Sequence, residues 1–290
     1  MEMKKQGINL CQYLETMNKD LHVLASGIKP LSTWHRQRVL QTCRECCGGQ
    51  GLLAANLIGN LMSDTEIDVT WEGDNSVLLQ QVSLALLKDY GKLLKAKSAF
   101  AIFMEYYGFF RRNSISLSGY RVIDLYVTAL AFRQKTLLME AGSIFRDGAK
   151  LPRNPQNKLK VLNKCLPILL GLGIAHMEHE VLVRFKAIVE GGNNPILSKI
   201  CLLSAVDVVN QNMAFYLEKQ YFNSNDAGSM RQLLQELCAE LQPNALQLID
   251  AFKIHPNFLD APIANDWLAA NTKDRVPGDS SVKCDHRSKL

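Results

Sequence analysis

Glu72 is the residue of this 290-residue chain whose setting first suggests chemistry. It lies in the hexapeptide TWEGDN at residues 70–75, between the bulky Trp71 and the flexible Gly73, just before an apolar helical pattern begins. A carboxylate beside an indole at the start of a helix is either part of an ordinary helix cap or a general base. A helix N-terminus favours the ionised carboxylate, which suits both roles, so the residues alone leave the choice open.

Three cysteines, Cys43, Cys46 and Cys47, form a CxxCC sequence in which zinc or redox chemistry is conceivable. A structural zinc site needs about four ligands, and the nearest other cysteine, Cys11, has no partner beside it. A redox CxxC is expected near a βαβ pattern, which the sequence lacks. We therefore expect ordinary, reduced helix cysteines that act as small hydrophobic residues.

His176 and His179 stand one helical turn apart and could share a metal ion with Glu180. Their order differs from the HExxH pattern of zinc proteases, and polar residues at this spacing more often form a solvated helix face. We therefore expect a solvated face here and no metal site in the chain.

The GGQG sequence at residues 48–51 is not a dinucleotide-binding fingerprint, because no strand precedes it and the GxGxxG spacing fails. By itself it ends a helix. Two adjacent glycines also permit a close approach of the backbone to a bulky ligand, so a cofactor contact is physically allowed. The spacing does not choose between these two roles.

The elements that position these residues are predicted to be helices almost throughout. Apolar residues recur every three or four positions, and β-branched residues never gather in the alternating pattern of strands. Asp74 or Asn75 caps one helix, which places Glu72 in the connection that enters it. The predicted helices cover residues 6–25, 31–47, 75–97, 118–147, 158–190, 196–221, 226–252 and 258–271, with a turn at 26–30 and an irregular connection over 61–71.

Composition and charge exclude several functional classes. The hydrophobic content of 47% is enough for a globular core, and the net charge of +5 is scattered without the basic, aromatic-studded stripe of nucleic-acid binding. We expect no signal peptide, because MEMKKQGINL turns polar before an apolar core develops. The longest apolar stretch, residues 166–175, is about half of the ~20 residues of a membrane span. We expect neither a nucleic-acid partner nor a membrane span.

The segment from Cys43 to Leu87 closely resembles the signature region of the acyl-CoA oxidases, the flavoenzymes of peroxisomal β-oxidation. It reads CRECCGGQGLLAANLIGNLMSDTEIDVTWEGDNSVLLQQVSLALL, where the family text is close to CREACGGxG and, further along, TFEGDNxVLxQQ. Trp71 replaces the more usual Phe or Tyr, and Cys46 replaces the usual Ala. A looser similarity through LCAELQPNALQLIDAF and APIANDWL extends the resemblance over essentially the whole chain after about Leu21.

The resemblance implies an all-α fold, namely a helical bundle from the C-terminal portion of the acyl-CoA oxidase/dehydrogenase fold, followed by the oxidase C-terminal helical domain. Residues 1–97 are then the end of the flavin-binding helical domain with the EGDN motif, residues 98–272 the C-terminal domain, and residues 273–290 a flexible tail. Family members also carry an N-terminal helical domain and a β-domain that nothing here supplies. The sequence therefore resembles the C-terminal part of an oxidase.

The resemblance also implies a reaction and its residues. Glu72 removes the α-proton of a fatty acyl-CoA while the β-hydrogen leaves as hydride to FAD; molecular oxygen then reoxidises the flavin and gives hydrogen peroxide beside trans-2-enoyl-CoA. Gly73 corresponds to the glycine beside the thioester. Such a base must be dry, so we expect Trp71 to help desolvate Glu72. The FAD-binding residues implied are Gly48 and Gly49, across a homodimer interface, and Asp74, Asn75 and Ser76.

Two alternatives stand beside the oxidase. One is a catalytically silent, dimerising fragment or subunit that keeps the import and dimer surfaces but not the reaction. The other is an acyl-CoA dehydrogenase that passes electrons to a carrier protein, which the SKL ending and the second helical domain disfavour. The sequence does not indicate the preferred acyl chain length.

Ser288, Lys289 and Leu290 form the SKL sequence that the peroxisomal import receptor recognises at a free carboxyl terminus, which predicts a peroxisomal location. We expect a fluorescent reporter that ends in residues 273–290 to accumulate in peroxisomes. The same reporter without Leu290 should remain in the cytosol, because the receptor reads the terminal residues. Microscopy beside a peroxisomal marker measures both, and unchanged localisation after the deletion would mean that SKL is coincidental.

Overall fold

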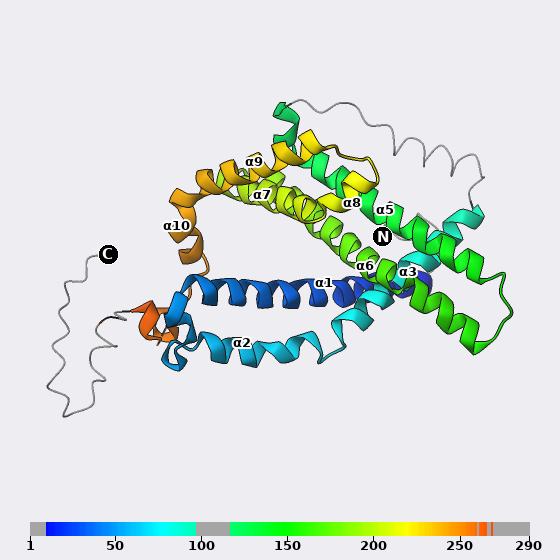
Figure 1. Cartoon of the computed structure of the whole chain (residues 1–290), viewed down its shortest axis with the longest axis horizontal. Helices are drawn as coiled ribbons and strands as arrows, with labels where there is room; N and C mark the ends of the chain where they lie inside the picture. The colour runs from blue at the N-terminus through cyan, green and yellow to red at the C-terminus, as the bar shows by residue number, and fades with distance from the viewer. Residues whose placement is uncertain (1–9, 97–116, 260, 266–267, 269–290) are drawn as a thin grey trace. The chain divides into compact units, whose positions relative to one another are not determined.

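The computed structural model describes residues 10–96, 117–259, 261–265 and 268. These residues form α-helices joined by 3-10 turns and loops, and no strand occurs among them (Figure 1). The all-α prediction is confirmed. The chain divides into two compact units, of which the first comprises residues 1–34 and 69–246 and the second residues 35–68 and 247–290. The predicted domain boundary at residues 97/98 lies outside the described residues and stays a prediction.

The first unit is a helical bundle with α6 at its centre. Helix α6 contacts α3, α5 and α7, and α7 in turn contacts α9. The elements of this unit are residues 10–34 of α1 (Leu10–Cys46), α3 (Asn75–Ala96), η5 (Leu117–Arg121), α5 (Ile123–Gly148), α6 (Pro155–Gly192), α7 (Pro195–Gln211), α8 (Met213–Glu218), α9 (Ser224–Leu241) and η6 (Gln242–Asn244). Helix α10 (Ala245–Asp250) follows directly.

The core of the first unit has two parts. The larger lies between α5, α6, α7, α8 and α9, and the smaller joins α5 to α6 through Ala141, Cys165 and Leu169. An ion pair between Arg133 and Glu178 lies beside the larger part, with both side chains almost fully buried. The largest fully buried side chains of the larger part are Tyr126, Leu130, Phe132, Tyr216, Met230, Leu237 and Val206.

Glycines allow helix α6 to approach two other helices closely. A Cβ atom at Gly173 would lie 2.9 Å from the carbonyl oxygen of Leu79 in α3, and one at Gly27 of α1 would lie 2.3 Å from the sulfur of Met177 in α6. The hydroxyl of Ser83 in α3 donates a buried 2.6 Å hydrogen bond to the carbonyl oxygen of Leu169. Helices α1 and α3 are therefore both fixed against α6.

The starts of the later helices follow from their capping residues. Asn154 and Asn194 accept hydrogen bonds from backbone N–H groups in the first turns of α6 and α7, and a proline occupies the first turn of each helix. Asn223 and Asp226 form a reciprocal capping box at α9. These polar side chains satisfy N–H groups that have no partner inside the helix.

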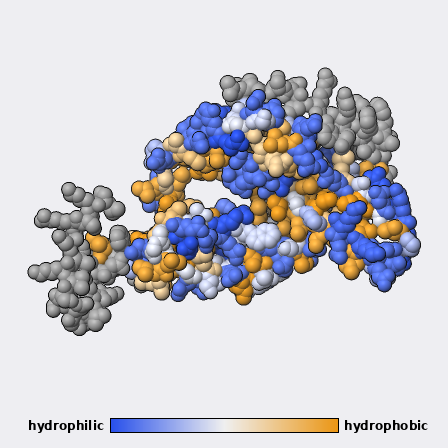
Figure 2. All heavy atoms as spheres, in the orientation of Figure 1, coloured by the Kyte–Doolittle hydropathy of each residue, from blue (hydrophilic) through white to orange (hydrophobic). Residues whose placement is uncertain are grey.

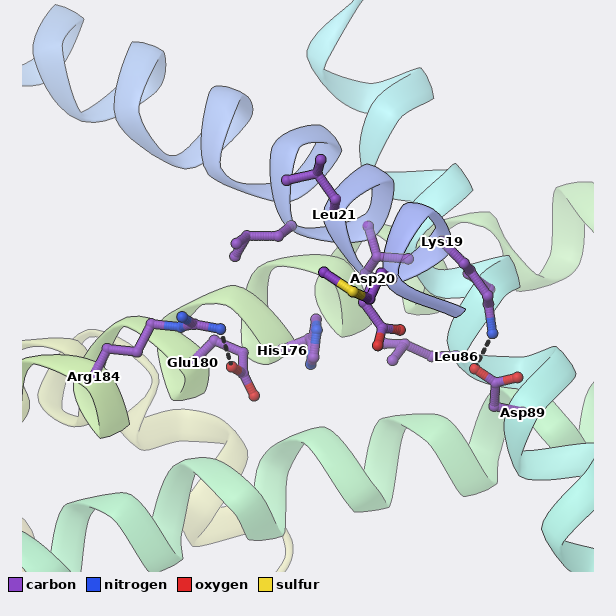
Figure 3. A pocket seen from close by; sticks show the side chains of 12 residues that line it. Lys19, Asp20, Leu21, Leu86, Asp89, His176, Glu180 and Arg184 are labelled. Atoms are coloured by element: carbon purple, nitrogen blue, oxygen red, sulfur yellow. Dashed lines mark hydrogen bonds and ion pairs between the residues drawn. The ribbon is translucent and has the colours of Figure 1, made fainter. Parts of the chain in front are cut away.

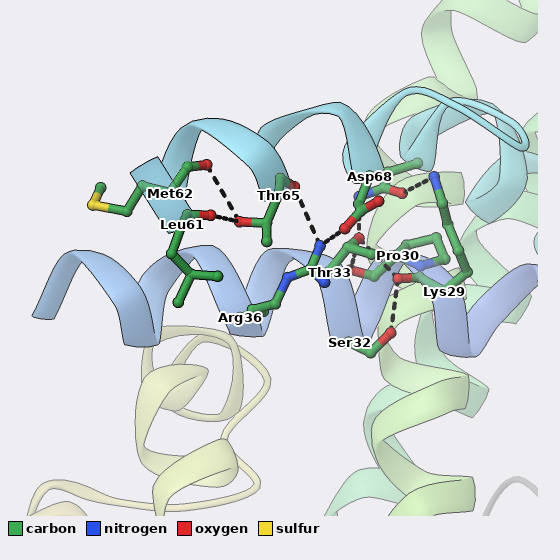
Figure 4. A network of polar contacts seen from close by, with 10 residues as sticks. Lys29, Pro30, Ser32, Thr33, Arg36, Leu61, Met62, Thr65 and Asp68 are labelled. Carbon is green, nitrogen blue, oxygen red and sulfur yellow. Dashed lines mark hydrogen bonds and ion pairs between the residues drawn. The ribbon is translucent and has the colours of Figure 1, made fainter. Parts of the chain in front are cut away.

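The second unit is built from the end of α1 and a series of short elements. After residues 35–46 of α1 come η2 (Gly48–Leu52), η3 (Ala54–Asn56), α2 (Ile58–Glu66), most of η4 (Ile67–Val69), η7 (Pro256–Phe258) and η8 (Pro262–Ala264). Asn56 joins its turns, because it donates to the carbonyl oxygen of Gln50 at 2.9 Å and accepts from the N–H of Ile263 at 2.9 Å. Arg36 pairs with Asp68 and donates to the carbonyl oxygen of Thr65 at 3.2 Å (Figure 4).

The predicted turn at residues 26–30 was wrong, because α1 runs unbroken from Leu10 to Cys46. Gly27 serves the contact with Met177 and does not end the helix. Pro30 lies inside the helix, where it cannot donate a backbone hydrogen bond. The hydroxyls of Ser32 and Thr33 donate to the carbonyl oxygen of Lys29 at 3.1 and 2.8 Å. Side chains thus add hydrogen bonds in the helical turn that contains Pro30.

Four other predicted boundaries also differ. The connection expected over 61–71 contains most of α2, and the helix expected over 196–221 is broken at Asn212, which separates α7 from α8. The helix expected over 226–252 ends at Leu241, and Pro243 lies in the 3-10 turn that follows. The described part of 258–271 is mainly 3-10 turns rather than a helix, because Pro256 and Pro262 favour short turns there.

Helix α6 is the one helix, among the residues that the structure describes, long and apolar enough to cross a membrane by length and composition. Within its most apolar 18-residue window, 33% of the residues are buried in the protein. A core helix of a globular protein passes the same test, and α6 contacts α3, α5 and α7. The observation is weak evidence for a membrane span.

The surface of the first unit carries exposed apolar residues as well as polar ones. Figure 2 shows hydrophobic residues among hydrophilic ones on the face that it presents. Helix α1 leaves Tyr13, Leu14, Met17 and Leu21 exposed. Tyr13, Met17 and Leu21 are spaced four residues apart and therefore lie along one side of the helix.

Gly173→Ala tests the close contact between α3 and α6. We expect it to lower the free energy of unfolding by about 1–3 kcal/mol, because the added methyl group meets the Leu79 backbone, which cannot turn away as a side chain can. Gly171→Ala on the same helix is the matched control. Its Cβ would lie 3.7 Å from Leu137, an ordinary contact, so it should raise stability by about 0.5–1 kcal/mol. Urea unfolding followed by circular dichroism measures both, and equal effects would contradict the contact.

Candidate functional site

Glu72 lies in a tight loop with an uncommon backbone conformation. Its φ angle is 55°, in the left-handed region that side chains with a Cβ atom disfavour, and Gly73 follows with φ 109°. A Cβ atom at Gly73 would lie 2.9 Å from the Leu78 side chain. The loop turns sharply at these two residues and enters α3 at Asn75.

Asp74 caps α3. Its carboxylate accepts hydrogen bonds from the N–H groups of Ser76 and Val77 at 2.9 and 3.1 Å, and its carbonyl oxygen accepts from Leu78 at 2.9 Å. The prediction that Asp74 or Asn75 caps this helix is confirmed for Asp74. Glu72 lies outside the cap, so its carboxylate is not required for the start of α3.

Lys29 of α1 holds the loop in place. Its Nζ atom donates to the carbonyl oxygen of Gly73 at 2.7 Å and to Oδ1 of Asn75 at 2.9 Å. Nδ2 of Asn75 donates in turn to the hydroxyl of Thr33 at 2.9 Å, which donates to the Lys29 carbonyl oxygen at 2.8 Å (Figure 4). This closed network fixes the loop to one turn of α1.

Lys29 also interacts electrostatically with Asp74 and Glu72. Burial lowers the pKa of the Lys29 ammonium below its ordinary value, and the negative charges of Asp74 and then Glu72 oppose that effect. The ammonium therefore lies within electrostatic reach of both carboxylates. Sequence reasoning missed Lys29, because it lies more than 40 positions before the motif.

The side chains of the motif differ in their exposure. Asn75 is 1% exposed and its amide is engaged by Lys29 and Thr33, whereas Glu72 and Asp74 are exposed and Ser76 is half-buried. Trp71 is 53% exposed. The expectation that Trp71 shields Glu72 from water is wrong for this structure, because the two side chains both face solvent.

Gly48 and Gly49 lie where α1 ends, in the second unit. Gly48 has φ 56°, and a Cβ atom at either residue would meet nothing within 4 Å. Gly51 is different, since a Cβ atom there would lie 2.2 Å from the carbonyl oxygen of Arg44. The chain's own packing thus explains Gly51, which sequence reasoning did not single out, while the outer side of Gly48 and Gly49 is open to a ligand or partner.

A pocket of about 490 Å³ lies in the first unit, apart from the Glu72 motif (Figure 3). It is lined by residues of α1, α3 and α6, and its charged groups include two local pairs, Lys19 with Asp89 and Arg184 with Glu180 at 3.5 Å. His176 also faces it and contacts Gln134 through Nδ1 at 3.2 Å. Asp20 adds a further carboxylate to the lining, so acidic side chains outnumber the lysine and arginine there.

His176 and His179 are half-buried, and the predicted solvated face was wrong. Burial lowers the pKa of both imidazoles, and the nearby charge of Glu180 opposes that effect. Within the ranges that the structure describes, no group of three or more His, Cys, Asp or Glu side chains is placed to hold a metal ion. The thiols of Cys43 and Cys46 are exposed and that of Cys47 is half-buried, so the predicted role of small buried hydrophobic residues was wrong for the first two.

Two family models match the chain. The model described as acyl-CoA oxidase, C-alpha1 domain, matches residues 1–87, and the model described as acyl-CoA oxidase matches residues 123–266. Together they cover most of the sequence. The gap between them contains the segment from residue 97 to residue 116 that lies outside the described residues.

Solved structures share the fold. Acyl-CoA oxidase 1 of Arabidopsis thaliana aligns with a TM-score of 0.77 and 21% identity, over 94% of this chain and 43% of that one. Acyl-CoA oxidase-1 of Caenorhabditis elegans, solved in complex with FAD and ATP, aligns with a TM-score of 0.77 and 18% identity, over 94% of this chain and 43% of that one.

Relatives at the sequence level are also oxidases. The chain is 30% identical to peroxisomal acyl-coenzyme A oxidase 3 of Arabidopsis thaliana, over 89% of this chain and 39% of that protein. It is 29% identical to peroxisomal acyl-coenzyme A oxidase 3 of Homo sapiens, over 92% of this chain and 40% of that protein. The chain thus spans about two fifths of the length of these relatives. On the two family matches and these alignments, the chain belongs to the acyl-CoA oxidase family.

Proposed function

We propose that this chain takes part in the FAD-dependent oxidation of fatty acyl-CoA to trans-2-enoyl-CoA, with Glu72 as the general base. The observation that carries the proposal is the conformation of Glu72. Its backbone is held in the left-handed region while its side chain faces solvent and takes no part in the helix cap. A left-handed conformation at a residue with a Cβ atom is locally strained, and strain of this kind clusters at functional sites.

The chemistry assigned to Glu72 is the removal of the α-proton of the thioester by a carboxylate oxygen. A general base must be aimed at its proton, and the loop supplies this aim. Lys29 fixes the Gly73 carbonyl oxygen and Asp74 fixes the first turn of α3, so the residues that follow Glu72 are held. Gly73 is exposed next to the base, where the thioester would lie.

The residues present fit an FAD molecule at two places. The outer sides of Gly48 and Gly49 are open, which permits a close approach of the ADP portion to the backbone. Asp74 and Ser76 are the more accessible polar residues of the motif, whereas the Asn75 side chain is occupied by Lys29 and Thr33. When bound, FAD would accept the hydride that leaves the β-carbon of the substrate, and molecular oxygen would then take up the electrons as hydrogen peroxide.

The same proposal includes the partners and the location of the protein. A homodimer in which Gly48 and Gly49 serve the flavin of the partner subunit is supported by their open surface. The names of the peroxisomal relatives support a peroxisomal location and an import receptor as partner. Ser288, Lys289 and Leu290 lie outside the described residues, and their targeting role stays a prediction.

Glu72→Gln tests the proposed base in a flavin-containing preparation of the oxidase that includes these residues. We expect binding of FAD and acyl-CoA to change little, because the amide keeps the shape of the side chain. The rate of flavin bleaching on anaerobic mixing with acyl-CoA should fall by roughly 10²–10⁴-fold, since loss of a general base typically costs that much. Bleaching reports the reductive half-reaction without oxygen chemistry.

Asp74→Asn is the matched control, because it removes a negative charge two positions away while an amide oxygen can still cap α3. It should weaken the helix cap or the flavin contact by about 1 kcal/mol but spare the chemical step, so the flavin-loaded variant should bleach at a rate close to the parent. If Glu72→Gln bleaches as fast as the parent, the assignment of Glu72 is wrong. If the flavin-loaded parent itself does not bleach with any acyl-CoA, the silent subunit becomes the better description.

The strained conformation gives an independent prediction. Glu72→Gly should raise the free energy of unfolding by about 1 kcal/mol, because glycine adopts positive φ without a Cβ clash. Glu72→Ala should leave stability near that of the parent, because alanine keeps the Cβ atom. Urea unfolding of the three proteins measures the difference. A destabilised Glu72→Gly variant would show that the side chain serves the fold.

A further inference from the structure

Cys43, Cys46 and Cys47 lie together in the last turn of α1 and directly after it, and the proposed reaction does not use them. Cys43 and Cys46 are exposed, and Cys47 is half-buried. Residues three apart in a helix occupy the same face one turn apart. The first two thiols therefore share an accessible face of the helix.

The separation of Cys43 and Cys46 suits a disulfide. Cα atoms three positions apart in a helix lie about 5 Å apart, inside the range of about 4.4–6.8 Å that disulfides span. Their Cβ atoms, at about 5–6 Å, must approach to roughly 3.8 Å, so the last turn has to loosen slightly. The helix ends at Cys46, and only the bond from the Cys47 N–H to the Cys43 carbonyl oxygen, at 3.1 Å, extends this turn.

The remaining described cysteines differ in their surroundings. Cys165 and Cys201 are buried, and burial raises the pKa of both thiols, which disfavours the reactive thiolate. Cys238 is exposed on α9 and has no second cysteine within one helical turn along the sequence. Cys165 and Cys201 are therefore controls for burial, and Cys238 is a control for an exposed thiol without a neighbouring cysteine.

We propose that Cys43 and Cys46 are a peroxide-sensitive dithiol that closes to a reversible disulfide at the end of α1. One sulfur attacks hydrogen peroxide, the O–O bond breaks, and a sulfenic acid and water result. The second sulfur then attacks the sulfenic sulfur, the S–S bond forms, the S–O bond breaks, and a second water leaves. Two electrons pass from the two sulfurs to one peroxide, and a thiol reductant reverses the reaction.

This modification bears on the proposed cofactor site. Arg44 lies between the two cysteines, and its carbonyl oxygen lies 2.2 Å from the position that a Cβ atom at Gly51 would occupy. A shift of this turn therefore displaces the GGQG segment, which includes Gly48 and Gly49. The proposal takes its physiological oxidant from the proposed function, since hydrogen peroxide is a product of that reaction. The dithiol would then respond to a product of the proposed reaction.

Peptide mapping of the purified full chain tests the disulfide. The reduced protein is treated with a small excess of added hydrogen peroxide, blocked with N-ethylmaleimide and digested with trypsin without reduction. Trypsin cuts after Arg44 and separates the peptide 39–44, which holds Cys43, from the peptide 45–88, which holds Cys46 and Cys47. We expect the two peptides to be recovered mainly as one linked species, which dithiothreitol separates. Cys165 and Cys201 should remain thiols that are blocked only after denaturation.

Two variants assign the pair. Cys47→Ser should keep the linked peptides and Cys46→Ser should lose them. The proposal is overturned if Cys46→Ser keeps the link, if Cys46 joins Cys47 within one peptide, or if Cys43 is recovered only as a blocked thiol or a sulfinic acid. Cys238 should yield no intramolecular disulfide under the same treatment. Peroxide is added and not produced by turnover, so failure of the proposed reaction does not affect this outcome.

Hydrogen exchange supplies a second measurement on the unmutated chain. Closure loosens the turn that the Cys47 N–H completes, so the amides of residues 46–53 should exchange severalfold faster after oxidation and return to the starting rate after reduction. A rate that is unchanged while the linked peptides form would overturn the coupling to the GGQG segment and leave the disulfide as an isolated modification.

Discussion

The contact between α3 and α6 at Gly173 is the constraint on which the candidate site depends. The backbone carbonyl oxygen of Leu79 occupies the space that a side chain at residue 173 would need, and Ser83 donates to the Leu169 carbonyl oxygen one turn further along α3. Because backbone atoms meet, α3 has little freedom to slide or roll on α6. The loop that carries Glu72 leads directly into α3, so its position follows from this contact.

Helix α1 also supports the loop that carries Glu72, because one of its turns contacts both α6 and the loop. Gly27 allows α1 to approach Met177 of α6, whereas Lys29 reaches the Gly73 carbonyl oxygen and Asn75. Residues two apart in a helix point to different sides. The same turn can therefore pack against α6 and hold the loop. A lysine, with three donors on a flexible stem, suits this task, since it satisfies a carbonyl oxygen and an amide oxygen at once.

Much of this arrangement is predictable from local pattern. Apolar periodicity indicated the all-helical class and most long helices, and a short polar side chain before an apolar run indicated the Asp74 cap. The errors arose where the meaning of a residue depends on a distant neighbour. Gly27 has the local signature of a turn, yet it serves a helix contact with a residue 150 positions away. The partners of Asn75, Lys29 and Thr33, belong to α1 in the same way, so no spacing rule within the motif indicates them.

The exposure of Glu72 separates two requirements of a general base, orientation and the exclusion of water. A base that removes a weakly acidic proton works best where water is excluded. In this structure the loop next to the Glu72 carboxylate is held in place, but the carboxylate itself is exposed to water. Orientation comes from Lys29, Gly73 and Asp74, all within the first unit. On the proposed function, exclusion of water has to come from what binds over the loop, namely acyl-CoA, the flavin or further polypeptide. The energy of that binding would then be used to desolvate the base at the moment when the substrate is in place, which is when the reaction requires it.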